Sequence, residues 1–124
     1  RCMSPVRMAK IESGMRIVLE FNEAFNRHDA NKIAELLSTD CVFETTNPAP
    51  DGSVYQGKEV ILQYLQGFFE RSPQAHMEIE ELSGMGMHCI LRWKYTWGDG
   101  YVRGVDIFKI EENLICEKFS YVKG

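Results

Sequence analysis

Asp106 is the polar residue whose position in this chain most clearly indicates chemistry. It lies in YVRGVDIFKI, residues 101–110, where β-strand alternation places it on the same face as Val102, Phe108 and Ile110. An apolar face of this kind is expected to pack into a core. Because an unpartnered buried charge is unfavourable, the carboxyl group must keep its proton or find a hydrogen-bonding or charged partner.

A carboxyl group set into an apolar wall is suited to acid/base catalysis. Apolar surroundings disfavour the charged form, so such a group can hold a proton near neutral pH and donate it, or donate a hydrogen bond to an oxyanion. This assistance is typically worth about 10²–10⁴-fold in rate. We therefore take Asp106 as the candidate catalytic residue. The alternative is a structural carboxylate that bonds to the backbone or to a nearby tyrosine.

Two polar residues of the last apolar segment are candidates for the same site. In LICEKFSYV, alternation places Lys118 and Ser120 on one face together with Val122. A lysine close to Asp106 would pair with it and hold it in the charged form, which is the opposite of the proton-holding acid. The alternative for Lys118 is a side chain that extends to solvent at the rim of the site.

Large apolar and aromatic side chains are expected around Asp106, where they would form a pocket for a small hydrophobic molecule. The aromatic residues of MHCILRWKYTW alternate onto one face of a neighbouring strand, and Gly104 removes bulk on the strand of Asp106. For many of these residues a structural role in the core is the main expectation, and lining the pocket is the second. Tyr55 lies in a predicted loop that could cover the pocket mouth. The predicted ligand-binding residues are Phe21, Phe25, Tyr55, Tyr64, Phe68, Leu91, Trp93, Tyr95, Phe108, Lys118 and Ser120.

The cysteines and histidines form no metal-binding pattern, and we expect neither a metal nor a cofactor. His28 follows the first predicted helix, where a structural role at the negative end of the helix dipole is expected. His76 and His88 are alternative catalytic bases. Because CxxC spacing is missing, buried free thiols are expected, with a disulfide as the alternative, at Cys2, Cys41, Cys89 and Cys116.

The first half of the chain predicts three helices. Apolar residues recur at helical spacing over about 6–27, and a second helix begins after the N-cap Asp29, with Leu37 in its buried stripe. A third helix is expected over about 57–71. The short strand CVFET and the loop NPAPDGSVYQG separate the last two helices.

In the second half the period changes from 3.6 to 2. Alternating segments separated by short turns predict an antiparallel meander of four strands, AHMEIEEL, MHCILRWKYTW, YVRGVDIFKI and LICEKFSYV. Helices followed by strands indicate an α+β fold, in which helices lie across one face of a curved sheet.

Length and composition favour one ordinary globular domain over residues 1–124, with 1–7 as a disordered start or one added for expression. The hydrophobic fraction is 44% and the charged fraction 26%. The net charge is −4 and no basic stripe is visible, so we expect neither nucleic acid nor a membrane as a partner. No segment is long and apolar enough to span a bilayer, and no signal peptide is visible, so a cytoplasmic location is expected.

Three segments taken in order, FNEAFNRHDANKIAELLSTDCVFE, GSVYQGKEVI and RGVDIFKIEENLICEKFSYVKG, resemble the SnoaL-like polyketide cyclases. These belong to the nuclear transport factor 2-like superfamily, which also includes ketosteroid isomerases. The resemblance covers about residues 8–124. It implies a cone-shaped α+β barrel, with the N-terminal helices packed in the concave face of a strongly curved, mainly antiparallel sheet. It also implies an apolar pocket and a homodimer through the sheet face.

The resemblance places Asp106 where ketosteroid isomerases keep a pocket aspartic acid and near the acid/base aspartate of SnoaL-type cyclases. The general base of the isomerases would fall at Thr45 and their helical tyrosine at Phe21. Steroid isomerisation is therefore not expected. Epoxide hydrolases of the superfamily need an Asp-Arg-Asp cluster, and Arg103 should point away from Asp106.

The sequence therefore supports two hypotheses. The first is a cofactor-free isomerase, cyclase or lyase that uses acid/base chemistry at Asp106. The alternative is a non-enzymatic module that binds a small ligand or serves dimerisation.

Overall fold

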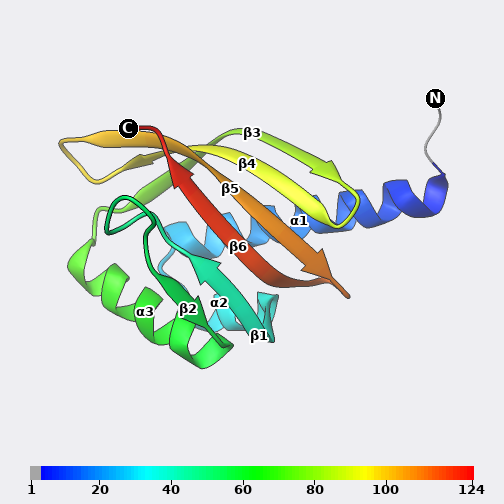
Figure 1. The fold of residues 1–124 in the computed structure, drawn as a ribbon, viewed down its shortest axis with the longest axis horizontal. Helices are drawn as coiled ribbons and strands as arrows, with labels where there is room; N and C mark the ends of the chain where they lie inside the picture. The colour runs from blue at the N-terminus through cyan, green and yellow to red at the C-terminus, as the bar shows by residue number, and fades with distance from the viewer. Residues whose placement is uncertain (1–3) are drawn as a thin grey trace.

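Residues 4–124 are described by the computed structural model, and they form three helices and one six-stranded sheet (Figure 1). The elements follow the chain in the order α1 (Pro5–Asn26), α2 (Ala30–Leu36), β1 (Leu37–Glu44), β2 (Val54–Gln56), α3 (Lys58–Arg71), β3 (His76–Met85), β4 (His88–Thr96), β5 (Tyr101–Glu111) and β6 (Leu114–Val122). The three helices and the four-strand meander are confirmed. None of the helices of residues 4–124 is long and apolar enough to cross a membrane.

The helix boundaries follow from capping residues. Ser4 accepts a hydrogen bond at its side chain from the backbone N–H of Arg7 (3.2 Å), and Pro5 fits the first turn, so α1 begins at residue 5. Residues 5–7, which were expected to belong to a disordered or added start, are therefore helical, and residues 1–3 lie outside the described part. The predicted N-cap of α2 is confirmed, because Asp29 Oδ1 accepts from the backbone N–H of Lys32 at 3.0 Å.

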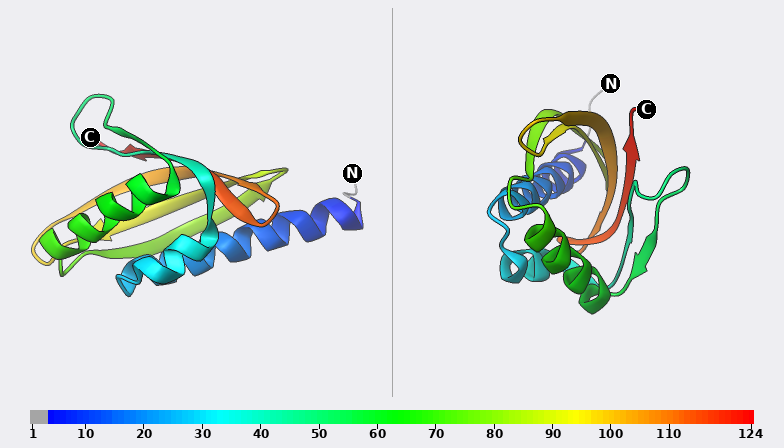
Figure 2. Two further views of the ribbon diagram at one scale, coloured as in Figure 1. Left: turned by 90° about the horizontal axis from the view of Figure 1, so that it is seen from below. Right: turned by 90° about the vertical axis from the view of Figure 1, so that its left-hand side faces the viewer.

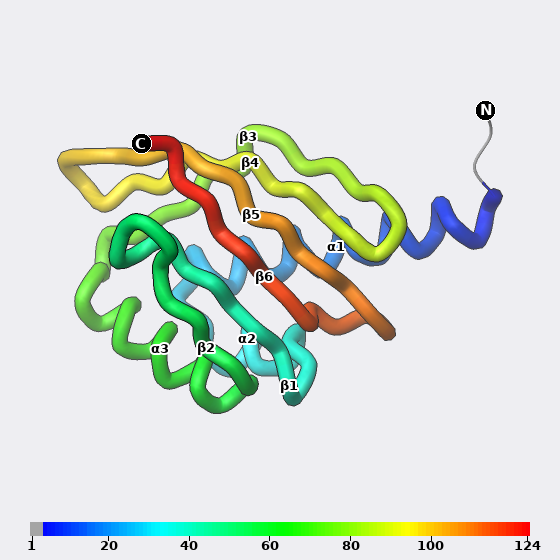
Figure 3. Tube along the Cα trace, viewed as in Figure 1, coloured from blue at the N-terminus to red at the C-terminus, as the bar shows by residue number. Residues whose placement is uncertain are grey.

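The strands form one mixed sheet in the order β2-β1-β6-β5-β4-β3. Every neighbouring pair is antiparallel except β1 and β6, which are parallel. Figure 3 shows β6 running between β1 and β5. Within the described residues β2 and β3 are the edges, so the sheet remains open.

Two local predictions need correction at β1 and β2. β1 already begins at Leu37, which was expected in the buried stripe of α2, because its backbone pairs with Ile115 of β6. Val54–Gln56 form a strand inside the segment predicted as loop, and Tyr55 lies opposite Phe43 of β1. The first difference arises from pairing with the distant strand β6, and the second from pairing of β2 with β1 across the loop 45–53; both pairings outweigh local preference.

The helices cover the concave face of the curved sheet, as expected (Figure 2). Polar contacts fix α1 on β3: the Asn26 side chain accepts from the backbone N–H of Met77 (2.7 Å) and donates to its carbonyl oxygen (2.9 Å). Asn22 donates to the same carbonyl oxygen at 3.2 Å. The C-terminal part of α1 is thereby held against β3.

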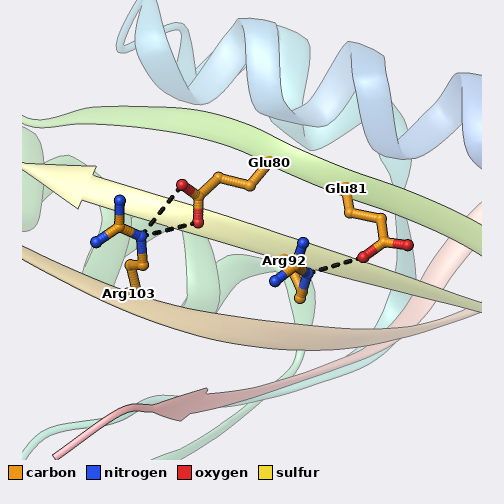
Figure 4. A network of polar contacts seen from close by, with 4 residues as sticks. All are labelled: Glu80, Glu81, Arg92 and Arg103. Carbon is orange, nitrogen blue, oxygen red and sulfur yellow. Dashed lines mark hydrogen bonds and ion pairs between the residues drawn. The ribbon is translucent and has the colours of Figure 1, made fainter.

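The two faces of the sheet differ as strand alternation predicts. Cys89, Leu91 and Trp93 of β4, and Asp106 and Phe108 of β5, are buried on the concave face. The convex face carries exposed ion pairs, Arg92 with Glu81 at 2.8 Å and Arg103 with Glu80 at 3.1 Å (Figure 4). Exposed pairs of this type contribute little stability, so the concave side supplies the core and the site.

Candidate functional site

A cavity of about 390 Å³ lies between the concave face of the sheet and the helices α1 and α3. Its volume falls within the range of about 300–1,000 Å³ typical of small-molecule sites. Most of its lining is apolar or aromatic, and its charged residues are Asp106, Lys118 and Lys123. The remaining lining residues are Phe21, Phe25, Phe43, Thr45, Thr46, Asn47, Tyr64, Leu65, Phe68, Met77, Trp93, Tyr95, Trp97, Val102, Ser120 and Val122.

Asp106 lies in the wall of this cavity and is only 2% exposed. The register of the sheet places it between Leu91 of β4 and Ser120 of β6. Its Oδ2 atom lies 3.6 Å from Lys118 Nζ, which makes an ion pair. Its Oδ1 atom has no hydrogen-bond partner among residues 4–124.

Lys118 points into the site instead of extending to solvent, and its side chain is 15% exposed. Nζ donates a hydrogen bond to Ser120 Oγ at 3.1 Å and lies 4.9 Å from the ring centroid of Phe43. An ammonium group over an aromatic ring is stabilised electrostatically. The rim position considered from the sequence is therefore wrong, and the pairing alternative is the arrangement observed. In this pair the Asp106 carboxylate carries the negative charge and the Lys118 ammonium group the positive charge.

Gly104 allows the indole of Trp93 to lie across β5. The two residues are directly opposite in the β4–β5 register. A Cβ atom on residue 104 would lie 2.5 Å from the Trp93 ring and 2.3 Å from the carbonyl oxygen of Tyr121. The predicted role of Gly104, to leave room for a close approach, is confirmed. Trp93 Nε1 is buried and has no hydrogen-bond partner within the described part of the chain.

Two tyrosines add phenol groups to the cavity lining. Burial raises the pKa of Tyr64, and burial also raises the pKa of Tyr95. Both phenols therefore stay protonated at neutral pH and are potential hydrogen-bond donors, not bases. Tyr55 stacks on Tyr64 with ring centroids 4.3 Å apart.

The structure brings most of the predicted site residues to one cavity. Asp106 and eight of the predicted ligand-binding residues line it: Phe21, Phe25, Tyr64, Phe68, Trp93, Tyr95, Lys118 and Ser120. The remaining three do not. Leu91 and Phe108 are enclosed by the core, Phe108 edge-on to Phe21, and Tyr55 lies behind Tyr64. Their predicted positions in the pocket wall are corrected accordingly.

Several lining residues were not predicted as site residues. Val102 and Val122 share the faces of Asp106 and Ser120, so alternation alone could have identified them. The segment 45–47 after β1 carries no local signal, because its position depends on how β1 pairs with β6. Thr45 Oγ1 donates to the carbonyl oxygen of Asn47 at 3.1 Å, so its hydroxyl is committed to this loop.

The other polar candidates lie away from the cavity. Arg103 is paired with Glu80 on the convex face, which confirms that it points away from Asp106. His28 stacks on Phe69, with ring centroids 4.5 Å apart. His76 and His88 are exposed, and none of the three histidines lines the cavity.

The described cysteines are free thiols, as expected. Cys41 and Cys89 are buried and Cys116 is half-buried. Burial raises the pKa of Cys41 to about 12 and that of Cys116 to about 11. Within residues 4–124, no group of three histidine, cysteine or acidic residues could hold a metal ion.

We expect alkaline pH to destabilise the protein through Cys41. The thiol pKa is about 12 in the folded chain against an ordinary value of 9.0, so the folded state binds the proton more tightly. This contribution is complete below about pH 9 and is lost as pH rises through about 12, at about 1.4 kcal/mol per pH unit. Urea unfolding between pH 8 and 11 measures the slope. Cys41→Ala should show a shallower slope, and equal slopes would contradict the assignment.

Comparisons with known proteins agree with this architecture. The chain is similar to an NTF2-like protein of unknown function from Mesorhizobium loti, with 34% identity, TM-score 0.83, and coverage of 93% of this chain and 94% of the other. A putative ketosteroid isomerase from Kribbella flavida shares 16% identity, with TM-score 0.80 and coverage of 93% and 81%. A putative polyketide cyclase from Sinorhizobium meliloti shares 20% identity, with TM-score 0.74 and coverage of 86% and 94%.

None of the curated proteins searched matches the chain in sequence. A family model does match it, the SnoaL-like domain, over residues 18–118. This match contains the elements from the middle of α1 to β6, and the likeness in structure extends beyond it. The chain therefore belongs to the SnoaL-like domain family, within the nuclear transport factor 2-like proteins.

Proposed function

We propose that the cavity binds a small, largely hydrophobic molecule and that Asp106 and Lys118 carry out cofactor-free acid/base chemistry on it. The observation that carries this proposal is a buried ion pair in the wall of an otherwise apolar cavity. An ion pair desolvated in this way is retained at a net cost in many proteins, so its presence beside an open cavity favours a functional role.

The pair supplies the two halves of a proton transfer. Lys118 Nζ can donate a hydrogen bond to a substrate oxygen, while Asp106 Oδ1, which has no partner among residues 4–124, can accept a proton. A substrate C–H or O–H bond breaks, the carboxylate takes the proton, and the electron pair remains on a substrate oxyanion beside the ammonium group. Return of the proton to another atom gives an isomerisation. Attack by the anion gives a cyclisation, and loss of a leaving group gives a lyase reaction.

The alternative is a cavity that binds its ligand without transforming it. Phe21 has no hydroxyl, and Thr45 is hydrogen-bonded within its own loop. Ketosteroid isomerases use a tyrosine hydroxyl and a general base at these two positions, and this chain has neither group there. This observation favours the binding module, so an experiment must distinguish a catalytic cavity from one that only binds its ligand.

The test compares Asp106→Asn with the wild type against a library of small carbonyl and aromatic compounds. Thermal shift identifies ligands, and NMR of each ligand mixture detects its conversion. Glu80→Gln, on the convex face, is the matched control. A ligand bound by all three proteins but converted only by wild type and Glu80→Gln supports catalysis. Binding without conversion by any of them supports the binding module. The proposal is overturned if no compound in the library stabilises the protein.

We also propose that two copies pair through the convex sheet face. Large apolar residues are exposed there, among them Ile90, Tyr101 and Tyr121. We expect sedimentation to show a dimer for the wild type and a monomer for Ile90→Lys, because a buried lysine in the interface is unfavourable. A monomeric wild type at micromolar concentration would contradict the pairing.

A further inference from the structure

The wall of the cavity contains one buried donor and one buried acceptor that no described residue satisfies. The donor is Trp93 Nε1 and the acceptor is Asp106 Oδ1. The two residues are 4% and 2% exposed, and both line the cavity. Buried polar groups are almost always hydrogen-bonded, so an unpartnered pair of opposite kind indicates a ligand group.

The sheet places these two groups as diagonal neighbours. Trp93 is opposite Gly104, and Asp106 lies two residues further along β5 on the same face. Diagonal neighbours of this kind are about 7–8 Å apart at the backbone, within reach of an aromatic side chain. Because residue 104 has no side chain, the indole lies against β5 instead of standing away from it.

The neighbouring polar groups are already engaged with one another. Asp106 Oδ2 faces the Lys118 ammonium, and Lys118 Nζ donates to Ser120 Oγ. The buried side-chain atoms in this part of the wall that have no partner among residues 4–124 are therefore one N–H and one carboxylate oxygen.

A hydroxyl group matches this combination, because its oxygen accepts while its O–H donates. A ketone or ether oxygen only accepts, and a carboxylate would meet the negative charge of Asp106. We propose that Trp93 and Asp106 form a subsite for the hydroxyl group of an apolar ligand, an aromatic or alicyclic alcohol, phenol or enol. This inference rests on the proposed function. In the catalytic case the proton that Asp106 Oδ1 accepts is the one on this hydroxyl, whose oxygen keeps the electron pair and the Trp93 hydrogen bond.

The test uses 2-naphthol and 2-methylnaphthalene, which differ by a hydroxyl in place of a methyl group of similar size. Calorimetric titration gives, for each protein, the affinity for 2-naphthol divided by the affinity for 2-methylnaphthalene. Because the same two ligands are used throughout, their difference in hydrophobicity cancels when this ratio is compared between proteins. We expect the ratio in wild type to exceed that in Asp106→Leu by about 10-fold or more, because a hydrogen bond to a charged group is lost. Trp93→Phe should lower the ratio as well, and Arg103→Gln on the convex face should leave it unchanged.

The outcomes separate this inference from the function on which it rests. If both compounds bind and the ratio is the same in all four proteins, the hydroxyl subsite is wrong while the ligand cavity stands. If neither compound nor any library member binds, both proposals fail. Circular dichroism of each variant verifies folding, and Asp106→Asn, which keeps the shape of the side chain, replaces any variant that does not fold.

Discussion

The variant Gly104→Ala is expected to lose about 3 kcal/mol of unfolding free energy. The added Cβ would lie 2.3 Å from the backbone oxygen of Tyr121 and 2.5 Å from the Trp93 ring. The backbone oxygen belongs to the β5–β6 ladder and cannot move without breaking strand pairing. The indole would have to leave its place over β5, so we also expect ligand affinity in the cavity to fall. Urea unfolding measures the first effect and calorimetric titration the second.

Gly67→Ala is the matched control for this substitution. Gly67 lies within α3, and the nearest atom to its added Cβ is the end of the flexible Arg71 side chain, at 3.0 Å. Alanine inside a helix is favoured over glycine by about 0.5–1 kcal/mol, so this variant should be more stable than wild type. If the two alanine variants change stability equally and in the same direction, the close approach at residue 104 is not the cause.

The second large effect is expected for Lys118→Met, which should lose about 3 kcal/mol of stability. The substitution keeps an unbranched side chain at this position but removes the charge that lies over the Phe43 ring and pairs with Asp106. Asp106 would remain as a buried charge without a partner within residues 4–124, and the loss of stability comes mainly from this orphaned carboxylate.

A double-mutant cycle tests that cause. Replacing both residues, as Asp106→Leu with Lys118→Met, should restore much of the lost stability, because an apolar pair needs no compensating charge. Urea unfolding of the four proteins gives the coupling energy. Simple additivity of the two substitutions would show that the pair at 3.6 Å does not interact. Any ligand conversion found for the wild type is expected to be lost in all three variants, so recovery of stability without recovery of conversion would identify a pair kept for function.

The parts of the fold that depend on local pattern could be predicted from the sequence. Alternation along β4 and β5 gave the buried face on which Trp93 and Asp106 lie, and the capping residue Asp29 gave the start of α2. β2 and the first residues of β1 were not predicted. The start of β1 is set by pairing with β6, far along the chain, and β2 by pairing with β1 across the loop 45–53, and a short segment carries no signal for either pairing.

The sequence predicted the sheet face of each site residue more reliably than whether the residue lines the cavity or lies in the closed core. Alternation brought Asp106, Lys118 and Ser120 to one side of the sheet, where the ion pair and hydrogen bond are found. It could not separate cavity lining from core, because Leu91 and Phe108 share those faces but lie where the packing is closed. Whether Lys118 would turn inward also depended on the Phe43 ring, which belongs to β1 and meets Lys118 in the parallel β1–β6 register.

That parallel pairing has a consequence for the order in which the chain folds. β1 belongs to the first half of the chain, and the strand that joins it to the meander is the last one, with Leu37 opposite Ile115. Contacts between such distant residues raise the relative contact order, so a chain of this kind is expected to fold more slowly than a helical bundle. During synthesis the helices and β1 must wait for β6 before the sheet is continuous. The cavity, with one wall on α1 and another on β6, is therefore among the last features to form.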